Sequence, residues 1–264
     1  MRRQISCWSA KVVITLSIGL AWAGGNAQCV ADSVADFSGV QGQNGWYYGY
    51  YDRDGDSDRT YNAATDFQLL PEYSASWESW YIQDGVFWTG IWNDGMHPNG
   101  RTTSGGRQSR EHWAVRRWVS SVAGNFVIRG HVAKHPHSTC CGDGTVVHIY
   151  LDGVEVWSGT RDYCDYTGYD YALSVTLQMG SIVDFVLDPN HQSNDWCDGT
   201  IFTAQIVSSL AGDVDRSGCV DDADLLQVLF AFGATEPNDA DVNCDGVVDD
   251  ADLLQVLFNF GSEC

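Results

Sequence analysis

The sequence has 264 residues and a formal net charge of −21, with 35 acidic residues against 14 basic ones. Such an acidic surface repels phosphate, which argues against nucleic acids and anionic membranes as partners and favours cations.

The first 27 residues predict a secretory signal peptide. Basic residues up to Lys11 precede an apolar run, Val12 to Ala23, and small residues follow as far as Ala27. The alternative is a lipoprotein anchor at Cys29, but the residues before it do not match the pattern that such processing needs. No later stretch reaches the ~20 apolar residues of a membrane span. We therefore expect a secreted, extracellular protein without membrane insertion.

Residues 28–207 predict a mainly β domain. His148 to Trp157 contains two alternating runs joined by Asp152-Gly153, a dipeptide that suits a tight hairpin turn. Further short β-rich segments are separated by Gly, Asp and Asn: Phe126–Val132, Tyr171–Leu177, Ser181–Leu187 and Ile201–Val207. Helical periodicity is nearly absent, so the fold class expected is an antiparallel, jelly-roll-like β-sandwich.

Eight cysteines remain after the predicted signal peptide, and an even number in an exported chain favours disulfides. The adjacent Cys140 and Cys141 bond more easily to two different partners than to each other. Cys164 and Cys197 are the candidate partners. Which pairs with which stays open. The others lie at the ends of the mature chain: Cys29, Cys219, Cys244 and Cys264.

Aromatic residues crowd the first half of the sandwich. Flat rings stack on sugar rings, so these residues suggest carbohydrate binding; the candidates are Trp46, Tyr48, Trp77, Trp80 and Trp92. Core packing is the alternative reading, since alternation turns half of a strand's side chains inward.

Three other groups of residues could carry chemistry. Asp52 to Asp58 reads DRDGDSD, which suits either a calcium site or an exposed hairpin tip. The stretch HVAKHPHSTCCGDG suggests a metal cluster of His131, His135 and His137 or a loop tied by disulfides. No catalytic signature is recognisable, although Asp94, Glu111 and Asp184 could form spatial pairs. We therefore predict no catalytic residues.

The composition changes at residues 208–212, which we take as a short linker. Beyond it Arg216 is the one basic residue, and the passage Val220–Gly233 recurs as Val248–Gly261 with a single difference. Each copy begins with an acidic loop and continues into an apolar run long enough for two helical turns, ended by glycine. No comparable helix precedes either loop.

Each loop places oxygen-bearing side chains at positions 1, 3, 5, 9 and 12 and glycine at position 6, the register that a hard cation such as Ca²⁺ requires. The side-chain ligands expected are Asp213, Asp215, Ser217, Asp221 and Asp224 in the first loop and Asp241, Asn243, Asp245, Asp249 and Asp252 in the second. Two calcium ions are the predicted cofactors.

A calcium loop followed by a helix but not preceded by one is half of a helix-loop-helix unit, and residues 213–264 resemble a type I dockerin on this ground. The resemblance implies that the carbonyls of Cys219 and Val247 complete the two sites and that the partner is a cohesin-domain protein. It also implies the contact residues Asp222, Ala223 and Gln227 with their equivalents Asp250, Ala251 and Gln255. Because both triplets are identical, a partner could dock in two orientations. The Lys or Arg pairs common on such helices are missing.

The β-sandwich resembles carbohydrate-binding modules in architecture more than in any motif. The sequence thus favours a secreted, non-catalytic protein in which a sandwich that binds a polysaccharide is attached to a partner by a calcium-dependent dockerin. The alternatives are a polysaccharide-degrading hydrolase carried by the same dockerin and a structural component of the cell surface.

Overall fold

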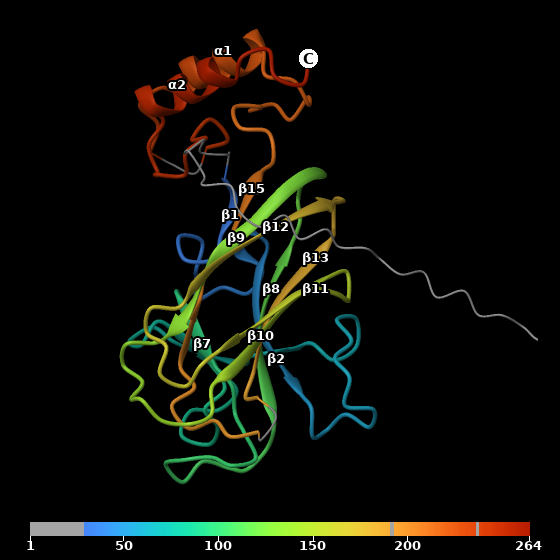
Figure 1. The fold of residues 1–264 in the computed structure, drawn as a ribbon, viewed down its shortest axis with the longest axis vertical. Helices are drawn as coiled ribbons and strands as arrows, with labels where there is room; N and C mark the ends of the chain where they lie inside the picture. The colour runs from blue at the N-terminus through green and yellow to red at the C-terminus, as the bar shows by residue number, and fades with distance from the viewer. Residues whose placement is uncertain (1–28, 191–192, 236–237) are drawn as a thin grey trace, which may run out of the picture.

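The computed structural model describes residues 29–190, 193–235 and 238–264. The predicted signal peptide lies outside the described residues. Two antiparallel sheets make up most of the molecule, and two helices lie together beyond one end of them (Figure 1). The chain is therefore mainly β, as the sequence predicts.

The first sheet has the strand order β1-β15-β9-β14-β7-β6-β5-β4, and β12 pairs with the other edge of β9. Its strands are β1 (Cys29–Asp32), β4 (Glu72–Ser74), β5 (Ser79–Tyr81), β6 (Gly90–Trp92), β7 (Gly95–His97), β9 (Gly124–Lys134), β12 (Tyr169–Leu177), β14 (Thr200–Phe202) and β15 (Gln205–Ser208). Because β1 pairs with β15, the first and last strands of the sandwich lie side by side.

The second sheet has the order β11-β10-β13-β8-β2-β3. Its strands are β2 (Trp46–Asp52), β3 (Gln68–Leu69), β8 (His112–Val119), β10 (Thr145–Leu151), β11 (Val154–Arg161) and β13 (Ile182–Asp188). A short 3-10 turn, Gln43–Gly45, leads into β2.

Aromatic side chains join the two sheets across the core. Phe185 of β13 meets Phe202 of β14 edge to face, with ring centroids 5.8 Å apart. Trp46 lies 6.0 Å from Phe185 and belongs to the same buried cluster. Side chains from both inner faces share this cluster, which is the packing of a β-sandwich.

The predicted hairpin between His148 and Trp157 is confirmed. β10 and β11 pair antiparallel around Asp152 and Gly153, which have φ values of 49° and 83°. Glycine accepts a positive φ without steric cost, and aspartate tolerates it better than most residues.

The predicted strand Ile201–Val207 is divided into β14 and β15. At the break, the carbonyl of Thr203 accepts a hydrogen bond of 2.7 Å from the Tyr171 hydroxyl. The N–H of Ala204 donates to the Ser33 hydroxyl at 2.8 Å. These side-chain partners replace ladder bonds, which a pattern of alternating hydrophobicity does not reveal.

The helices are α1 (Asp222–Ala231) and α2 (Asp250–Asn259). They begin ahead of the predicted apolar runs because Asp221 and Asp249 act as N-caps and Asp224 and Asp252 complete capping boxes. Buried valines form a second hydrophobic core beneath them, separate from the core of the sandwich.

Three disulfides are formed among the described residues. Cys140 pairs with Cys164 and Cys141 with Cys197, which resolves the pairing that the sequence left open. Cys219, in the first acidic loop, pairs with Cys264 at the end of the chain. In the described part of the chain, no helix is long and apolar enough to cross a membrane.

Candidate functional site

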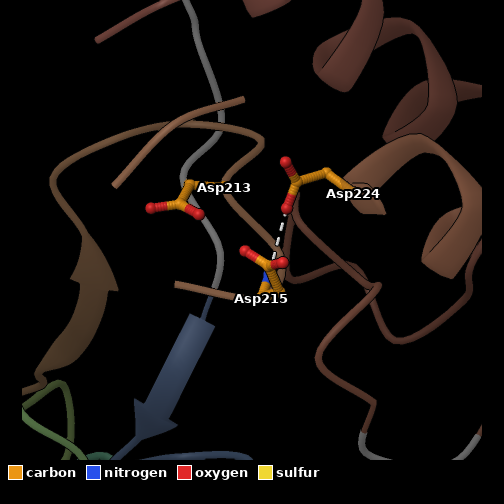
Figure 2. Close-up of side chains that lie close together, drawn as sticks. All are labelled: Asp213, Asp215 and Asp224. Carbon is orange, nitrogen blue, oxygen red and sulfur yellow. Dashed lines mark hydrogen bonds between the residues drawn. The ribbon is translucent and has the colours of Figure 1, made fainter. Parts of the chain in front are cut away.

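Three carboxylates of the first acidic loop converge. One oxygen each from Asp213, Asp215 and Asp224 lies within 4.8 Å of the other two (Figure 2). Asp213 and Asp224 are buried, whereas Asp215 is exposed. Clustered carboxylate oxygens are the ligands that Ca²⁺ prefers, so these residues fit such an ion.

The helix start and the loop are built around the same carboxylate. Oδ1 of Asp224 accepts backbone N–H groups from Val214 at 2.6 Å and Asp215 at 3.0 Å, and Oδ2 accepts the N–H of Asp221 at 2.8 Å. A carboxylate has about four lone-pair sites, so these three bonds leave one site, on Oδ2, for a cation.

A sharp turn at position 6 aims the first ligand. Gly218 has φ of 87°, and its N–H donates to Asp213 Oδ2 at 2.9 Å. The Ser217 hydroxyl points to the Cys219 carbonyl at 3.1 Å. The side chain of Asp221 accepts from the Ala223 N–H at 2.8 Å and so caps α1.

The second loop repeats the sharp glycine turn and the buried aspartate of the first loop. Gly246, with φ of 90°, donates its N–H to Asp241 Oδ2 at 2.9 Å. Asp252 is buried and accepts N–H groups from Asn243 at 3.1 Å and Asp249 at 2.8 Å.

Asp245 accepts hydrogen bonds from two neighbours in the same loop. Its Oδ1 accepts the N–H of Val247 at 3.0 Å, and its Oδ2 accepts the Asn243 side-chain amide at 2.9 Å. Similar backbone hydrogen bonds thus hold the aspartates at positions 1 and 12 in both loops.

The electrostatics of both loops favour a cation. Burial raises the pKa of Asp213, and the nearby carboxylates of Asp224 and Asp215 raise it further. Burial likewise raises the pKa of Asp252, with contributions from Asp241 and Asp245. A divalent ion would offset this repulsion.

The two loops and helices exchange contacts reciprocally. After α1, the N–H of Gly233 donates to the Val248 carbonyl at 2.8 Å, and the Val248 N–H donates to Ala234 at 2.9 Å. After α2, the N–H of Gly261 donates to the Val220 carbonyl at 2.8 Å. Each loop is therefore closed by the segment that follows the other helix.

The predicted partner contacts divide by exposure. Asp222, Ala223, Asp250 and Ala251 are exposed at the helix starts, and Gln227 is half-buried. Gln255 is 7% exposed and donates its side-chain amide to the Val242 carbonyl at 3.2 Å. The side chain of Gln255 thus serves the fold of the second loop and is not available on the surface.

An exposed apolar face on both helices was not singled out from the sequence. Phe230 and Phe258, equivalent in the two copies, are 86% and 83% exposed. Six further exposed side chains accompany them: Leu226, Leu229, Phe232, Leu254, Leu257 and Phe260. The sequence does indicate this face, because each ten-residue helix carries more apolar residues than a single buried stripe can hold. We call this set the helix apolar face.

Three of the five predicted carbohydrate contacts are buried. Trp46, Tyr48 and Trp80 are core residues, so their rings cannot stack on a sugar, and the prediction is corrected at these positions. Tyr48 and Trp80 stack on each other with ring centroids 5.7 Å apart. Trp77 is 74% exposed and Trp92 is half-buried.

Arginines pair with two of the four aspartates in the acidic stretch Asp52 to Asp58. Asp52 accepts from Arg110 Nε at 2.9 Å, and Asp54 accepts from Arg101 Nε at 3.0 Å. The Arg101 guanidinium lowers the pKa of the Asp54 carboxyl to about 2. Residues far apart in sequence thus form an ion-pair network here, which neither sequence interpretation anticipated.

Two carboxylates considered for catalysis are held in ion pairs. Glu111 pairs with Arg53 at 2.6 Å, and Asp184 pairs with Arg117 at 2.7 Å. Both carboxylates are buried. Each of these two carboxylates is thus paired with an arginine side chain.

The histidines considered as a metal cluster take different partners. His131 Nδ1 lies 2.7 Å from Asp170. The rings of His135 and His137 contact each other with centroids 5.1 Å apart.

No protein-family model and no curated protein matches the sequence. Solved structures with partial similarity include a family 35 carbohydrate-binding module from Clostridium thermocellum, 10% identical, covering 37% of this chain and 72% of that one, with a TM-score of 0.26. The second carbohydrate-binding module of family 51 with adjoining domains from Clostridium perfringens ZmpB, solved with GlcNAc, is 13% identical, covers 47% and 26%, and has a TM-score of 0.29. Rabbit GITRL is 13% identical, covers 36% and 69%, and has a TM-score of 0.24. Similarity at this level carries no argument about what this chain does.

Proposed function

We propose that this chain is a secreted two-module protein whose C-terminal module, residues 213–264, is a calcium-dependent docking module of the dockerin type. Its loops would each hold one Ca²⁺, and the ion would supply the charge that draws the carboxylates of each loop together. Asp213, Asp215 and Asp224 support the first site by their convergence.

The observation that carries the docking role is the helix apolar face. Two equivalent phenylalanines stand almost fully exposed on adjacent helices, and apolar patches of this kind mark surfaces that bind protein partners. Because the face is made of two matching halves, it suits a partner that docks in either of two orientations. A cohesin domain is the partner class that the dockerin resemblance implies.

Pull-down with an immobilised cohesin domain tests this function. The full mature chain should be retained in calcium and released by a chelator, while the same chain with both Phe230 and Phe258 changed to serine should not be retained. Equal retention with and without the chelator would contradict a calcium-dependent dock.

For the β-sandwich we propose carbohydrate binding, supported by the exposed ring of Trp77 in the turn between β4 and β5. Isothermal titration against a panel of polysaccharides should show binding by the native chain and a clear loss in Trp77→Ala. Trp80→Phe, at a buried neighbour, is the control for folding. Absence of binding to every member of the panel would remove this proposal and leave the docking role untouched.

A further inference from the structure

Two cysteines from opposite ends of the described chain face each other across the two modules. The thiols of Cys29 and Cys244 are hydrogen-bonding neighbours. Neither belongs to the three disulfides, which lie within the sandwich or within the C-terminal module. The pair therefore lies between the two modules, whereas each of the three disulfides described lies within one module.

The fold explains how residues so distant in sequence meet. Cys29 opens β1, which pairs with β15 in the register Cys29 to Val207, and β15 leads directly into the C-terminal module. Figure 1 shows the first residues of β1, in blue, reaching the end of the molecule where the helices lie. Cys244 stands between Asn243 and Asp245 in the second acidic loop.

The first loop lies against the sandwich as well. A cavity of about 440 Å³ is lined by Gly124 to Phe126 of β9 on one side and by Asp213, Ser217 and Gly218 of the first loop on the other. The N–H of Ser209 in the linker donates to the Asn125 carbonyl at 3.1 Å. The two modules therefore make contact beyond the linker.

We propose that Cys29 and Cys244 form a fourth disulfide, which fastens the second acidic loop to the start of the sandwich. Both cysteines are already neighbours in the fold, as two residues joined by a disulfide must be. In an exported chain the oxidising surroundings favour it.

The reaction is a thiol–disulfide exchange with a disulfide donor such as oxidised glutathione. One thiolate attacks the donor and expels a donor thiolate, leaving a mixed disulfide. The second thiolate then attacks the protein sulfur of that mixed disulfide, forms the Cys29–Cys244 bond and expels the other donor thiolate. The two cysteines lose two electrons and two protons, and the donor is reduced to two thiols.

The cross-link would give the C-terminal module a second covalent connection to the sandwich, beside the linker at residues 208–212. With two connections the module cannot swing freely, so the helix apolar face is presented in a fixed direction. The bond itself does not depend on the proposed calcium binding, and its test is independent of calcium.

Peptide mapping of the mature chain, refolded in a glutathione redox buffer and alkylated without reduction, tests the proposal. The expected result is a peptide pair joined through Cys29 and Cys244, with no alkyl group on either. In Cys29→Ser we expect one alkyl group, on Cys244. Alkylation of both cysteines in the native chain, or a bond from either to a different cysteine or a second chain, would overturn the proposal.

A second measurement uses no cysteine variant and so does not depend on whether such a variant folds. A specific protease site inserted between Ser209 and Leu210 allows the two modules to be cut apart after oxidation. On a non-reducing gel the cut chain should keep its full mass and should separate into two fragments when reductant is added. Separation without reductant would contradict the cross-link.

Discussion

Asp224 and Asp252 each perform two structural tasks. Each is fully buried, closes its acidic loop by accepting backbone N–H groups, and completes the capping box of the following helix. A glutamate at this position would place its carboxylate one methylene further from the helix start.

Loss of one buried ligand should weaken one calcium site. Asp213→Asn removes a charge from the converging carboxylates, and we expect affinity at the first loop to fall at least about tenfold while the second loop still binds. Asp222→Asn, at an exposed position of the same loop that is not a predicted ligand, is the matched control. Isothermal titration measures both; equal affinities for the two variants would contradict the assignment.

The ion pair of Asp54 should contribute to stability in a defined pH window. Its folded pKa of about 2 lies below the ordinary aspartate value, so its contribution is present above about pH 4 and is lost as the pH falls towards 2. The stability difference between the native chain and Asp54→Asn should therefore shrink over this range. Urea unfolding at several pH values measures it, with Asp84→Asn, at an exposed site, as control; a difference that grows on acidification would contradict the account.

How far individual residues could be predicted depends on the range of their contacts. The hairpin at Asp152-Gly153 follows from a local turn preference. The burial of Trp46 and Tyr48 could not be predicted, because both faces of β2 carry aromatics and only the packing of the first sheet against β2 decides which of them enter the sandwich core. The pairing of Asp54 with Arg101 joins residues far apart in the chain, and no local pattern reports it.

The two loop-helix elements depend on each other. Val220 and Val248 are buried, and each pairs through its backbone with the segment after the opposite helix. The duplication in the sequence predicts two similar elements. It does not predict that each is completed by the other, since that requires the three-dimensional arrangement.

Truncation of one of these valines should therefore weaken both elements. For Val248→Ala we expect a loss of roughly 2 kcal/mol in the stability of the C-terminal module, from two buried methyl groups and the cavity left behind. Val247→Ala removes an exposed side chain next to it and should be nearly neutral. Chemical denaturation followed by helix circular dichroism compares them, and equal losses for the two variants would count against the reciprocal arrangement.

The helix apolar face should show the redundancy of a symmetric surface. Phe230→Ser or Phe258→Ser alone leaves one intact half, so we expect partner affinity to fall only about twofold, corresponding to the loss of one of two equivalent orientations. The double variant should lose binding. Val40→Ser, an exposed apolar site on the sandwich, is the control. Surface plasmon resonance against a cohesin domain would contradict two-fold docking if one single variant alone abolished binding.

At the scale of the whole molecule, the core of the sandwich and the separate core beneath the helices differ in character. The sandwich core is large and rich in aromatics, whereas the core beneath the helices consists mainly of valines. The small module has little apolar surface to bury, and modules of this size commonly rely on metals or disulfides for stability. Its acidic loops and the Cys219–Cys264 bond supply the groups for both.

Calcium titration of the mature chain tests the central claim most directly. Isothermal titration should give two ions per chain, and chelator should reduce the helix signal at the far-ultraviolet minimum while leaving the β-sandwich folded, because metal binding is coupled to the folding of such modules. The contradicting result is a chain that takes up no calcium and keeps the same helix signal with chelator as with calcium.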